Sequence, residues 1–348
     1  MKYALIGCGR VSPNHIRAAL DNQLDIVALC DLNEQKMRQT ASQLPHEVDC
    51  YTDYRQLLSR EDVRMIAIAT DSGTHTELAL AAIAAGKHVL IEKPIALSMA
   101  DARRICKAAK ESRVTVGVCH QNRFNHAVVQ LRKALDAGRF GKLSHGAVTV
   151  RWNRSEAYYD QAAWRGTWAQ DGGTLMNQCI HGIDLLRWMM GDEICEVCGM
   201  TARRLHEHTE CEDVGMAVIR FQNGALGTVE GTANTYPKDM EETLSIFGQT
   251  GTVKLGGGSV NRVDQWLFAD GCEDMSQYAE QAANVYGNGH SRLYADFMAA
   301  IAEGREPLVD TYAGMAALEL VLAIYKSQKE GRVVRLPLEN FDCNDMKE

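Results

Sequence analysis

The chain predicts an α/β protein with two domains: a doubly wound parallel sheet, then an α+β domain with an open, mainly antiparallel sheet. Three observations lead there. Short apolar runs alternate with helical segments early in the chain, a glycine turn joins the first strand to the first helix, and paired alternating strands dominate after about residue 121. Because 348 residues exceed one ordinary core, we expect domains at residues 1–121 and 122–348.

The first domain is built from strand–helix repeats. Five apolar runs are expected to be buried strands, at residues 2–7, 25–30, 64–70, 88–94 and 114–119. Helices are expected between them, at residues 13–22, 33–43 (with Asn33 as N-cap), 74–86 and 98–112. Repeats of this length make consecutive strands parallel with right-handed crossovers, which gives a doubly wound sheet.

The second domain is richer in strands than in helices. Helices are expected at residues 124–137, 175–190, 291–303 and 312–329. Strands are expected at residues 143–152, 194–203, 214–222, 225–233, 243–248 and 251–256. Two pairs of these strands are separated by only a few turn residues, which is typical of hairpins, so the sheet should be mainly antiparallel.

Composition narrows the class of protein. Hydrophobic residues make up 46% and charged residues 24%, the balance of a globular protein, and the formal net charge is −8. No Lys/Arg stripe suggests nucleic-acid binding, and no apolar run approaches the roughly 20 residues of a membrane span. The start of the chain lacks a leader pattern and the eleven cysteines lack a disulfide-like framework, so we expect a cytoplasmic protein.

The turn after the first strand has the pattern of a dinucleotide site. Gly7 permits the tight turn, Gly9 lets the backbone approach a pyrophosphate at the helix N-terminus, and Ser12 is small enough for close packing. Asp31 ends the second strand. A carboxylate at this place accepts hydrogen bonds from the ribose hydroxyls and repels a 2′-phosphate, which favours NAD over NADP. The alternative is an ordinary glycine turn with a solvated Asp31. Predicted cofactor-binding residues are Gly7, Gly9, Arg10, Val11, Asp31, Thr70, His75, Glu92 and Lys93.

Lys93 is the first predicted catalytic residue. The sequence Glu92-Lys93-Pro94 closes the fourth strand, and open α/β sheets bind ligands at the carboxyl ends of their strands. A lysine there can polarise a hydroxyl or carbonyl oxygen while Glu92 positions it. A surface charge is the alternative, but the fourth strand should be central and buried.

The segment 175–190 carries the second predicted catalytic residue. Asn177, His181, Asp184 and Trp188 are spaced four, three and four apart, so a regular helix would place them on one face. The spacing alone slightly favours a half-buried histidine without a catalytic role.

The chain resembles the glucose–fructose oxidoreductase, inositol dehydrogenase and MocA-like family over essentially its whole length. The resemblance rests on IGCGRVSPNHI at the start, EKP, QNRF, DGGTLMNQCIHGIDLLRWMMG at 171–191, and the C-terminal tail. It implies a Rossmann domain, a second domain with an open sheet, and hydride transfer at a sugar-like ring carbon. It also implies proton transfer by His181 together with Lys93, and pairing of subunits into dimers or tetramers.

One departure narrows the subgroup. Many members carry Asp four residues before the histidine, whereas this chain has Asn177, which can orient substrate but cannot take up a proton. His181, with an ordinary pKa of about 6.5, then serves as the base. Asn177 and the segments 158–160 and 164–168 resemble UDP-N-acetylglucosamine and UDP-N-acetylglucosaminuronate 3-dehydrogenases. The predicted substrate-binding residues are Asn177, Arg165, Tyr159 and Asp184, with His290 as a further contact or simply a helix-start residue.

The predicted reaction is oxidation of a ring hydroxyl, at C3 of a UDP-linked amino sugar or its uronate. Two alternatives stay open: a dehydrogenase of a free sugar, inositol or other polyol, and a non-catalytic NAD-binding regulator. No metal is predicted, because Cys195 and Cys198 lie in an expected strand and are interpreted as buried cysteines. His206, His208 and Cys211 do not complete a four-ligand set.

Overall fold

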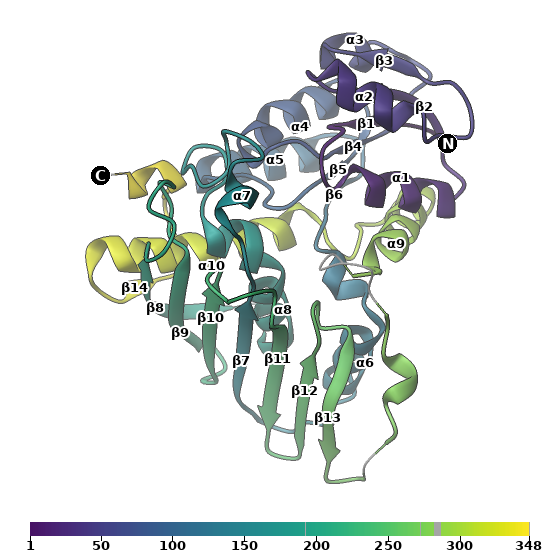
Figure 1. Cartoon of the computed structure of the whole chain (residues 1–348). Helices are drawn as coiled ribbons and strands as arrows, with labels where there is room; N and C mark the ends of the chain where they lie inside the picture. The colour runs from purple at the N-terminus through teal and green to yellow at the C-terminus, as the bar shows by residue number, and fades with distance from the viewer. Residues whose placement is uncertain (192, 272, 282–286, 348) are drawn as a thin grey trace. The chain divides into compact units, whose positions relative to one another are not determined.

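The computed structural model describes residues 1–191, 193–271, 273–281 and 287–347, which form two compact units (Figure 1). Unit 1 contains residues 1–96, 100–120 and 290–315, and unit 2 contains 97–99, 121–289 and 316–348. The predicted division at residues 1–121 and 122–348 is continuous along the chain, whereas a late segment returns to unit 1. Residues 290–315 belong to unit 1 because their side chains pack in it, and Tyr294 and Phe297 of this segment are buried.

Unit 1 is a six-stranded parallel sheet with the strand order β3-β2-β1-β4-β5-β6, which confirms the doubly wound prediction. Its strands are β1 (Lys2–Ile6), β2 (Asp25–Cys30), β3 (Asp49–Tyr51), β4 (Met65–Ile68), β5 (His88–Ile91) and β6 (Val116–Val118). Its helices are α1 (Ser12–Asp21), α2 (Glu34–Ala41), α3 (Tyr54–Leu58), α4 (His75–Ala84), α5 (Met99–Glu111) and α9 (Gly289–Glu303).

Local chemistry explains the better predicted elements of unit 1. The central strands β1 and β4 are almost wholly apolar, as strands covered on both faces must be. Asn33 caps α2 as predicted, with its side-chain oxygen accepting the backbone N–H of Lys36 at 3.0 Å. The short elements β3 and α3 were not predicted, since their few apolar residues carry no clear periodicity.

Unit 2 is built on an eight-stranded mixed sheet with the order β13-β12-β11-β7-β10-β9-β8-β14. Its strands are β7 (Leu143–Arg151), β8 (Ile194–Ala202), β9 (Val214–Phe221), β10 (Leu226–Thr232), β11 (Glu241–Gly248), β12 (Gly251–Gly256), β13 (Arg262–Phe268) and β14 (Val334–Arg335). Every pair is antiparallel except β7 with β10. The prediction of a mainly antiparallel sheet is confirmed, and β13 is the long strand it missed.

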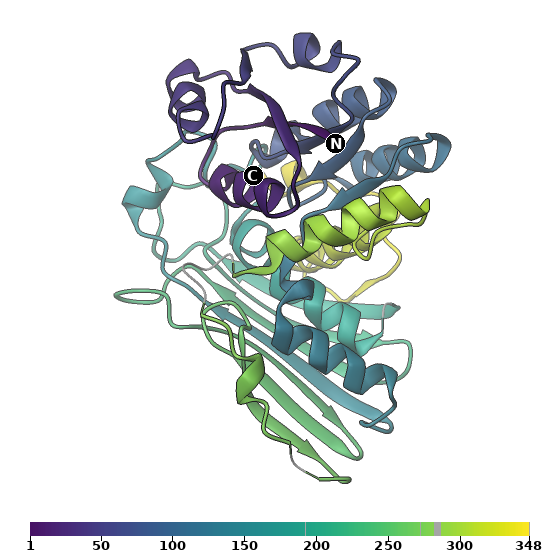
Figure 2. The ribbon, with the colours of Figure 1, turned by 90° about the vertical axis from the view of Figure 1, so that its right-hand side faces the viewer.

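The three long helices of unit 2 lie on one side of this sheet (Figure 2). They are α6 (His126–Asp136), α8 (Ile180–Met190) and α10 (Thr311–Glu330), whose first turn belongs to unit 1, and the short α7 (Glu156–Tyr159) lies apart from them. Glycines in the strands allow this packing: a Cβ on Gly146 would lie 2.8 Å from Met190 of α8, and one on Gly199 would lie 2.7 Å from Ile324 of α10. Along β9, inward side chains are buried while Met216 and Val218 are exposed.

The described cysteines form no disulfide with one another. The expectation of buried cysteines in β8 is wrong for Cys198, which is exposed, while Cys195 is half-buried. Alternation along the strand sends residues three apart to opposite faces, so the two thiols do not form a site together. Within the described ranges, no helix combines the length and apolar character needed to cross a membrane.

Candidate functional site

Gly7 adopts the positive φ that the tight turn after β1 was predicted to need. Gly7 has a φ of +101°, and a Cβ there would lie 2.4 Å from the carbonyl oxygen of Ala69. Gly9 differs, because a Cβ there would meet no heavy atom within 4 Å. Packing within the chain therefore requires glycine at position 7 but not at position 9, where the backbone is open to the close approach of a ligand. Arg10 and Val11 follow it at the exposed start of α1.

Asp31 lies directly after β2 and is tied to this turn. Its Oδ2 accepts the backbone N–H of Cys8 at 2.7 Å, and its Oδ1 accepts that of Asn33 at 2.7 Å. The carboxylate is thus fixed beside the N-terminus of α1, at the carboxyl ends of the parallel strands. Gly9, the helix N-terminus and Asp31 together fit a dinucleotide whose ribose hydroxyls bind the carboxylate.

Lys93 lies in the turn after β5 and is partly exposed, whereas Glu92 is buried. The backbone N–H of Lys93 donates to Glu92 Oε2 at 3.1 Å, and the Lys93–Pro94 peptide is cis. His75 is buried behind this turn, with Nδ1 2.7 Å from the carbonyl oxygen of Pro94. Its other nitrogen is 3.3 Å from the carbonyl oxygen of Thr70, so His75 braces the two loops that were predicted to meet the cofactor.

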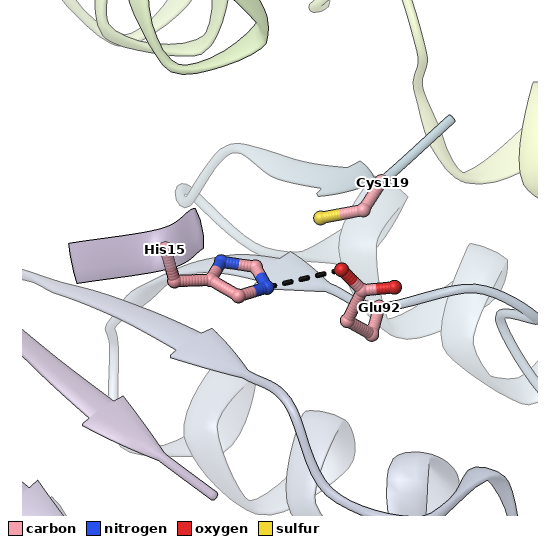
Figure 3. A group of neighbouring side chains, drawn as sticks. All are labelled: His15, Glu92 and Cys119. Carbon is pink, nitrogen blue, oxygen red and sulfur yellow. Dashed lines mark hydrogen bonds and ion pairs between the residues drawn. The ribbon is translucent and has the colours of Figure 1, made fainter. Parts of the chain in front are cut away.

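Glu92 belongs to a buried polar cluster whose members His15 and Cys119 were not among the predicted site residues (Figure 3). His15 of α1 places Nε2 3.0 Å from Glu92 Oε1, and Cys119 follows β6. One ligand atom from each of these three residues lies within 4.8 Å of the others. His290 also belongs here, with Nε2 3.8 Å from Glu92 Oε1. It lies at the start of α9, as one of its two predicted alternatives stated, and its side chain is buried.

The helix of unit 2 that carries His181 does not begin as a regular α-helix. Residues Leu175–Cys179 form a π-helical turn, and α8 follows from Ile180. Such turns are rare and frequent at functional sites. Asn177 lies in the π-turn, is partly exposed, and donates through its side-chain amide to Asp171. Asp171 also accepts the backbone N–H of Gly166 at 2.7 Å, which fixes the loop before the turn.

His181 lies in the first turn of α8, buried apart from 5% of its surface. The side-chain nitrogen of Gln121 is 3.4 Å from His181 Nε2. Because an amide nitrogen only donates, Nε2 is the acceptor in this arrangement and carries a lone pair.

Asp184 occupies a different place from the predicted one. Its side chain is fully buried, and both oxygens accept hydrogen bonds from Arg123, at 2.6 and 2.7 Å. The Arg123 guanidinium also lies 4.6 Å from the centre of the Trp188 ring. The prediction that Asp184 contacts substrate is not supported, because an ion pair of this kind leaves no oxygen facing outward. The π-turn also breaks the regular spacing that placed Asn177 on the same face.

An aromatic and arginine cluster adjoins Asn177. Tyr158 lies between two guanidinium groups, 4.2 Å from that of Arg165 and 5.3 Å from that of Arg154. Gln178 donates to the Tyr158 hydroxyl at 2.9 Å and accepts from Arg154 Nε at 2.8 Å. Of these two cations, Arg154 is buried and ion-paired with Asp239 at 2.9 Å, which leaves Arg165 as the guanidinium group that can bind an oxyanion.

Tyr159, the predicted substrate contact, lies outside this cluster. Its ring is buried and packs 4.9 Å from the His206 ring. His206 itself places Nε2 2.6 Å from the carbonyl oxygen of Arg154 and Nδ1 3.2 Å from Asp213. Both nitrogens are therefore engaged in holding the loops, and the neighbouring Tyr158 takes the position beside the arginines.

Two buried carboxyl groups of unit 2 support the α8 segment. Glu212 Oε1 accepts the backbone N–H of Leu175 and the Tyr325 hydroxyl, each at 2.8 Å. Glu242 of β11 accepts the side-chain nitrogen of Asn122 at 3.4 Å. Burial raises the pKa of both carboxyl groups to about 8, so both are largely neutral at pH 7.

Sequence reasoning missed most of these supporting residues. The family string QNRF contains Gln121, Asn122 and Arg123, but their partners lie about 60 to 120 positions away. Glu212 lies in the loop before β9, Glu242 in β11 and His15 in α1, and no local sequence signal marks any of them.

Comparisons with known proteins agree with this architecture. Residues 1–120 match the model of an oxidoreductase family with an NAD-binding Rossmann fold, and residues 128–254 match the GFO/IDH/MocA C-terminal domain. A WlbA dehydrogenase from Bordetella pertussis, solved with NADH and UDP-GlcNAcA, is 35% identical with a TM-score of 0.88, covering 97% of this chain and 99% of its own.

Two further relatives span the chain. A WlbA dehydrogenase from Chromobacterium violaceum, also solved with NADH and UDP-GlcNAcA, is 33% identical with a TM-score of 0.89, covering 97% of this chain and 96% of its own. The myo-inositol 2-dehydrogenase of Thermotoga maritima is 27% identical over 97% of this chain and 98% of its own. The chain belongs to the Gfo/Idh/MocA family of NAD-dependent oxidoreductases, whose relatives act on sugars and polyols.

Proposed function

We propose that this enzyme oxidises the C3 hydroxyl of a UDP-linked N-acetyl amino sugar, or of its uronate, to the 3-keto sugar. The observation that carries this proposal is the Arg154–Tyr158–Arg165 cluster beside Asn177. Arginine binds diphosphate or carboxylate oxygens, and Arg165, partly exposed beside Tyr158, is the group that can do so here. A neutral polyol such as inositol has no anionic group for Arg165 to bind.

Likeness to solved proteins supports the same choice. Two WlbA dehydrogenases that bind UDP-GlcNAcA are 35% and 33% identical to this chain, whereas the myo-inositol 2-dehydrogenase of Thermotoga maritima is 27% identical. Asn177 in place of Asp fits a site where the amide orients a substrate and His181 alone exchanges the proton.

The chemistry follows from the residues in each unit. Bound NAD supplies the acceptor for a hydride. His181 takes the hydroxyl proton at Nε2, the lone pair that Gln121 contacts weakly at 3.4 Å. Lys93 holds its positive charge against the developing alkoxide oxygen. The C3–H bond breaks with its electron pair, the O–H proton moves to His181, and a carbonyl group forms at C3.

The cofactor preference rests on Asp31. Its carboxylate is held by two backbone N–H groups at 2.7 Å, so it cannot swing aside to admit a 2′-phosphate. We therefore propose NAD as the working cofactor, held by the Gly7–Val11 turn and by Asp31.

The test is a substrate panel with direct detection of the product. The purified enzyme is mixed with NAD and UDP-N-acetylglucosamine, UDP-N-acetylglucosaminuronate, myo-inositol or glucose, with and without 2-oxoglutarate as a recycling acceptor. NADH absorbance and mass spectrometry of the sugar are followed together. A 3-keto UDP-sugar supports the proposal, and turnover on inositol or glucose alone overturns the choice of substrate.

A polyol substrate is the second candidate, because the myo-inositol dehydrogenase relative covers the whole chain. Arg165→Gln separates the two substrate classes. Loss of the guanidinium should raise KM for a UDP-sugar about tenfold or more, by removing a charge-assisted contact, and should leave polyol oxidation unchanged.

A separate variant tests the catalytic role of Lys93. If Lys93→Met binds NAD and retains full turnover, the catalytic role assigned to Lys93 is wrong.

We also propose that the enzyme is a homo-oligomer joined through the uncovered face of the unit 2 sheet. Met200, Met216 and Val218 are each more than half exposed on neighbouring strands β8 and β9. A contiguous exposed apolar surface is typical of a protein interface. Multi-angle light scattering should give a dimer or tetramer, and a monomeric mass would contradict the proposal.

A further inference from the structure

A chain of buried hydrogen bonds in unit 1 ends at the catalytic turn. Tyr3 and Tyr294 share a hydrogen bond of 3.0 Å between their hydroxyls, and the Tyr294 hydroxyl is 2.7 Å from His15 Nδ1. His15 Nε2 is 3.0 Å from Glu92 Oε1, and Glu92 Oε2 accepts the backbone N–H of Lys93 at 3.1 Å. His15, Tyr3 and Tyr294 are completely buried, and Glu92 is nearly so.

We propose that His15 is a positioning residue for Lys93, acting through the buried carboxylate of Glu92. The inference rests on the proposed function, in which Lys93 stabilises the alkoxide. His15 touches neither substrate nor reacting atoms. It ties the helix that follows the glycine turn to the turn that carries the catalytic lysine.

The charge of Glu92 decides which nitrogen of His15 donates to it. A carboxylate can only accept, so the proton of His15 lies on Nε2 and points at Glu92. His15 Nδ1 and the Tyr294 hydroxyl share the next hydrogen bond, at 2.7 Å, and the hydroxyls of Tyr294 and Tyr3 share the last, at 3.0 Å. Burial alone would raise the pKa of Glu92, but the interactions with His15 and His290 outweigh it and hold the pKa well below its usual range. Glu92 is therefore ionised, and only an ionised Glu92 accepts from both His15 and Lys93.

The position of Lys93 depends on this carboxylate. Glu92 accepts the backbone N–H of Lys93 with one oxygen and His15 with the other, so its plane is fixed from both sides. The ammonium of Lys93 lies near the same cluster. Burial raises the pKa of Cys119 and lowers that of His290, and the charge of Lys93 acts on both. Without His15, Glu92 Oε1 would lose its donor at 3.0 Å and keep only His290 at 3.8 Å, so the carboxylate could turn toward the lysine ammonium.

A metal ion is the competing use of these residues. His15, Glu92 and Cys119 offer ligand atoms within 4.8 Å of one another (Figure 3). However, both nitrogens of His15 already make hydrogen bonds, and burial raises the pKa of the Cys119 thiol well above its usual range, which disfavours the thiolate that binds zinc. These features favour the hydrogen-bonded chain.

The experiment compares two variants that are matched in chemistry. In His15→Gln the side-chain nitrogen can replace Nε2 and still donate to Glu92. In His15→Asn the shorter amide can reach Tyr294 but not Glu92. We expect kcat on the UDP-sugar to fall about 10- to 100-fold in His15→Asn, as expected when a catalytic group is displaced by about 1 Å. In His15→Gln it should stay within about threefold of wild type, with KM and NAD affinity unchanged in both variants.

A second readout needs no substrate. The rate at which acetic anhydride labels Lys93, quantified by peptide mass spectrometry, should change in His15→Asn and stay at the wild-type value in His15→Gln. If the wild type shows no turnover on any sugar, the proposed function fails, while this labelling still tests the positioning role. Tyr294→Phe keeps the Glu92 bond and should behave like His15→Gln.

Three results would overturn the inference. Equal kcat and labelling in both His15 variants would show that the bond to Glu92 does not matter. Equal losses in both, accompanied by weaker NAD binding or a lower melting temperature, would show a purely structural role. Stoichiometric zinc in the purified enzyme, lost in both variants, would assign the cluster to a metal instead.

Discussion

Replacing Arg123 by Met tests the buried ion pair beneath the catalytic helix. Asp184 is fully buried, and Arg123 donates to both of its oxygens at 2.6 and 2.7 Å. Met retains an unbranched aliphatic chain that can still pack on the Trp188 ring, so the change removes the charge more than the packing. Asp184 would then be a buried carboxylate that has lost its bidentate partner.

Removing one partner of a buried pair costs about 3–5 kcal/mol. Arg187 remains 4.0 Å from Asp184 and offsets part of this loss, so we expect about 3 kcal/mol. For a domain of this size that corresponds to a fall in melting temperature of about 6–12 °C. Unfolding in urea, followed by tryptophan fluorescence, measures the free energy directly.

The double variant Arg123→Met/Asp184→Leu is the control. Replacing both members of a buried pair by apolar residues of similar size is often close to neutral, so the double variant should recover more than half of the loss. The reasoning is refuted if the single variant loses less than about 1 kcal/mol, or if the double variant is no more stable than the single one.

Three further predictions concern the cofactor turn and the buried acid. Asp31→Ser combined with Leu32→Arg should lower kcat/KM for NAD and raise it for NADP, each about tenfold or more, because the carboxylate that repels a 2′-phosphate is gone; initial rates with both cofactors check this. Gly9→Ala should leave the melting temperature unchanged but weaken NAD binding at least about tenfold, since its Cβ meets only space within the chain, whereas Gly7→Ala should also lower the melting temperature; calorimetric titration and thermal scans separate the two. Burial raises the pKa of Glu212 from 4.5 to about 8, so between these values the unfolded chain has released a proton that the folded chain keeps, and stability falls as pH rises. Relative to wild type, Glu212→Gln should therefore gain about 1.4 kcal/mol for each pH unit from 5 to 8, and parallel urea curves that show a constant difference would contradict this.

The sequence was sufficient for the architecture because periodicity and turn chemistry are local. Five apolar runs separated by helices could only become a parallel sheet, and Gly7 could be assigned its turn before its +101° φ was known. The short β3 and α3 and the strand β13 escaped, since their patterns are weak and tertiary packing decides them.

Site residues could be predicted only where they lie at the end of a recognisable strand or in a glycine turn. Lys93 and Asp31 end strands, and their placement follows from the topology of an open sheet. Asp184 was misassigned because its partner Arg123 arrives from a distant segment, whereas the π-turn before α8 affects only the predicted placement of Asn177. Tyr159 and Tyr158 cannot be distinguished by sequence, since which ring lies between the arginines depends on the loop conformation.

The central claim is hydride transfer from C3 of a UDP-linked amino sugar with Lys93 and His181 as the catalytic residues. The most direct measurement is a single-turnover reaction of enzyme and NAD with UDP-N-acetylglucosaminuronate deuterated at C3, analysed by mass spectrometry. We predict reduced cofactor carrying the deuterium and a 3-keto sugar that has lost it, with neither product formed by Lys93→Met or His181→Asn. Reduced cofactor without deuterium, or full product formation by either variant, would contradict the account.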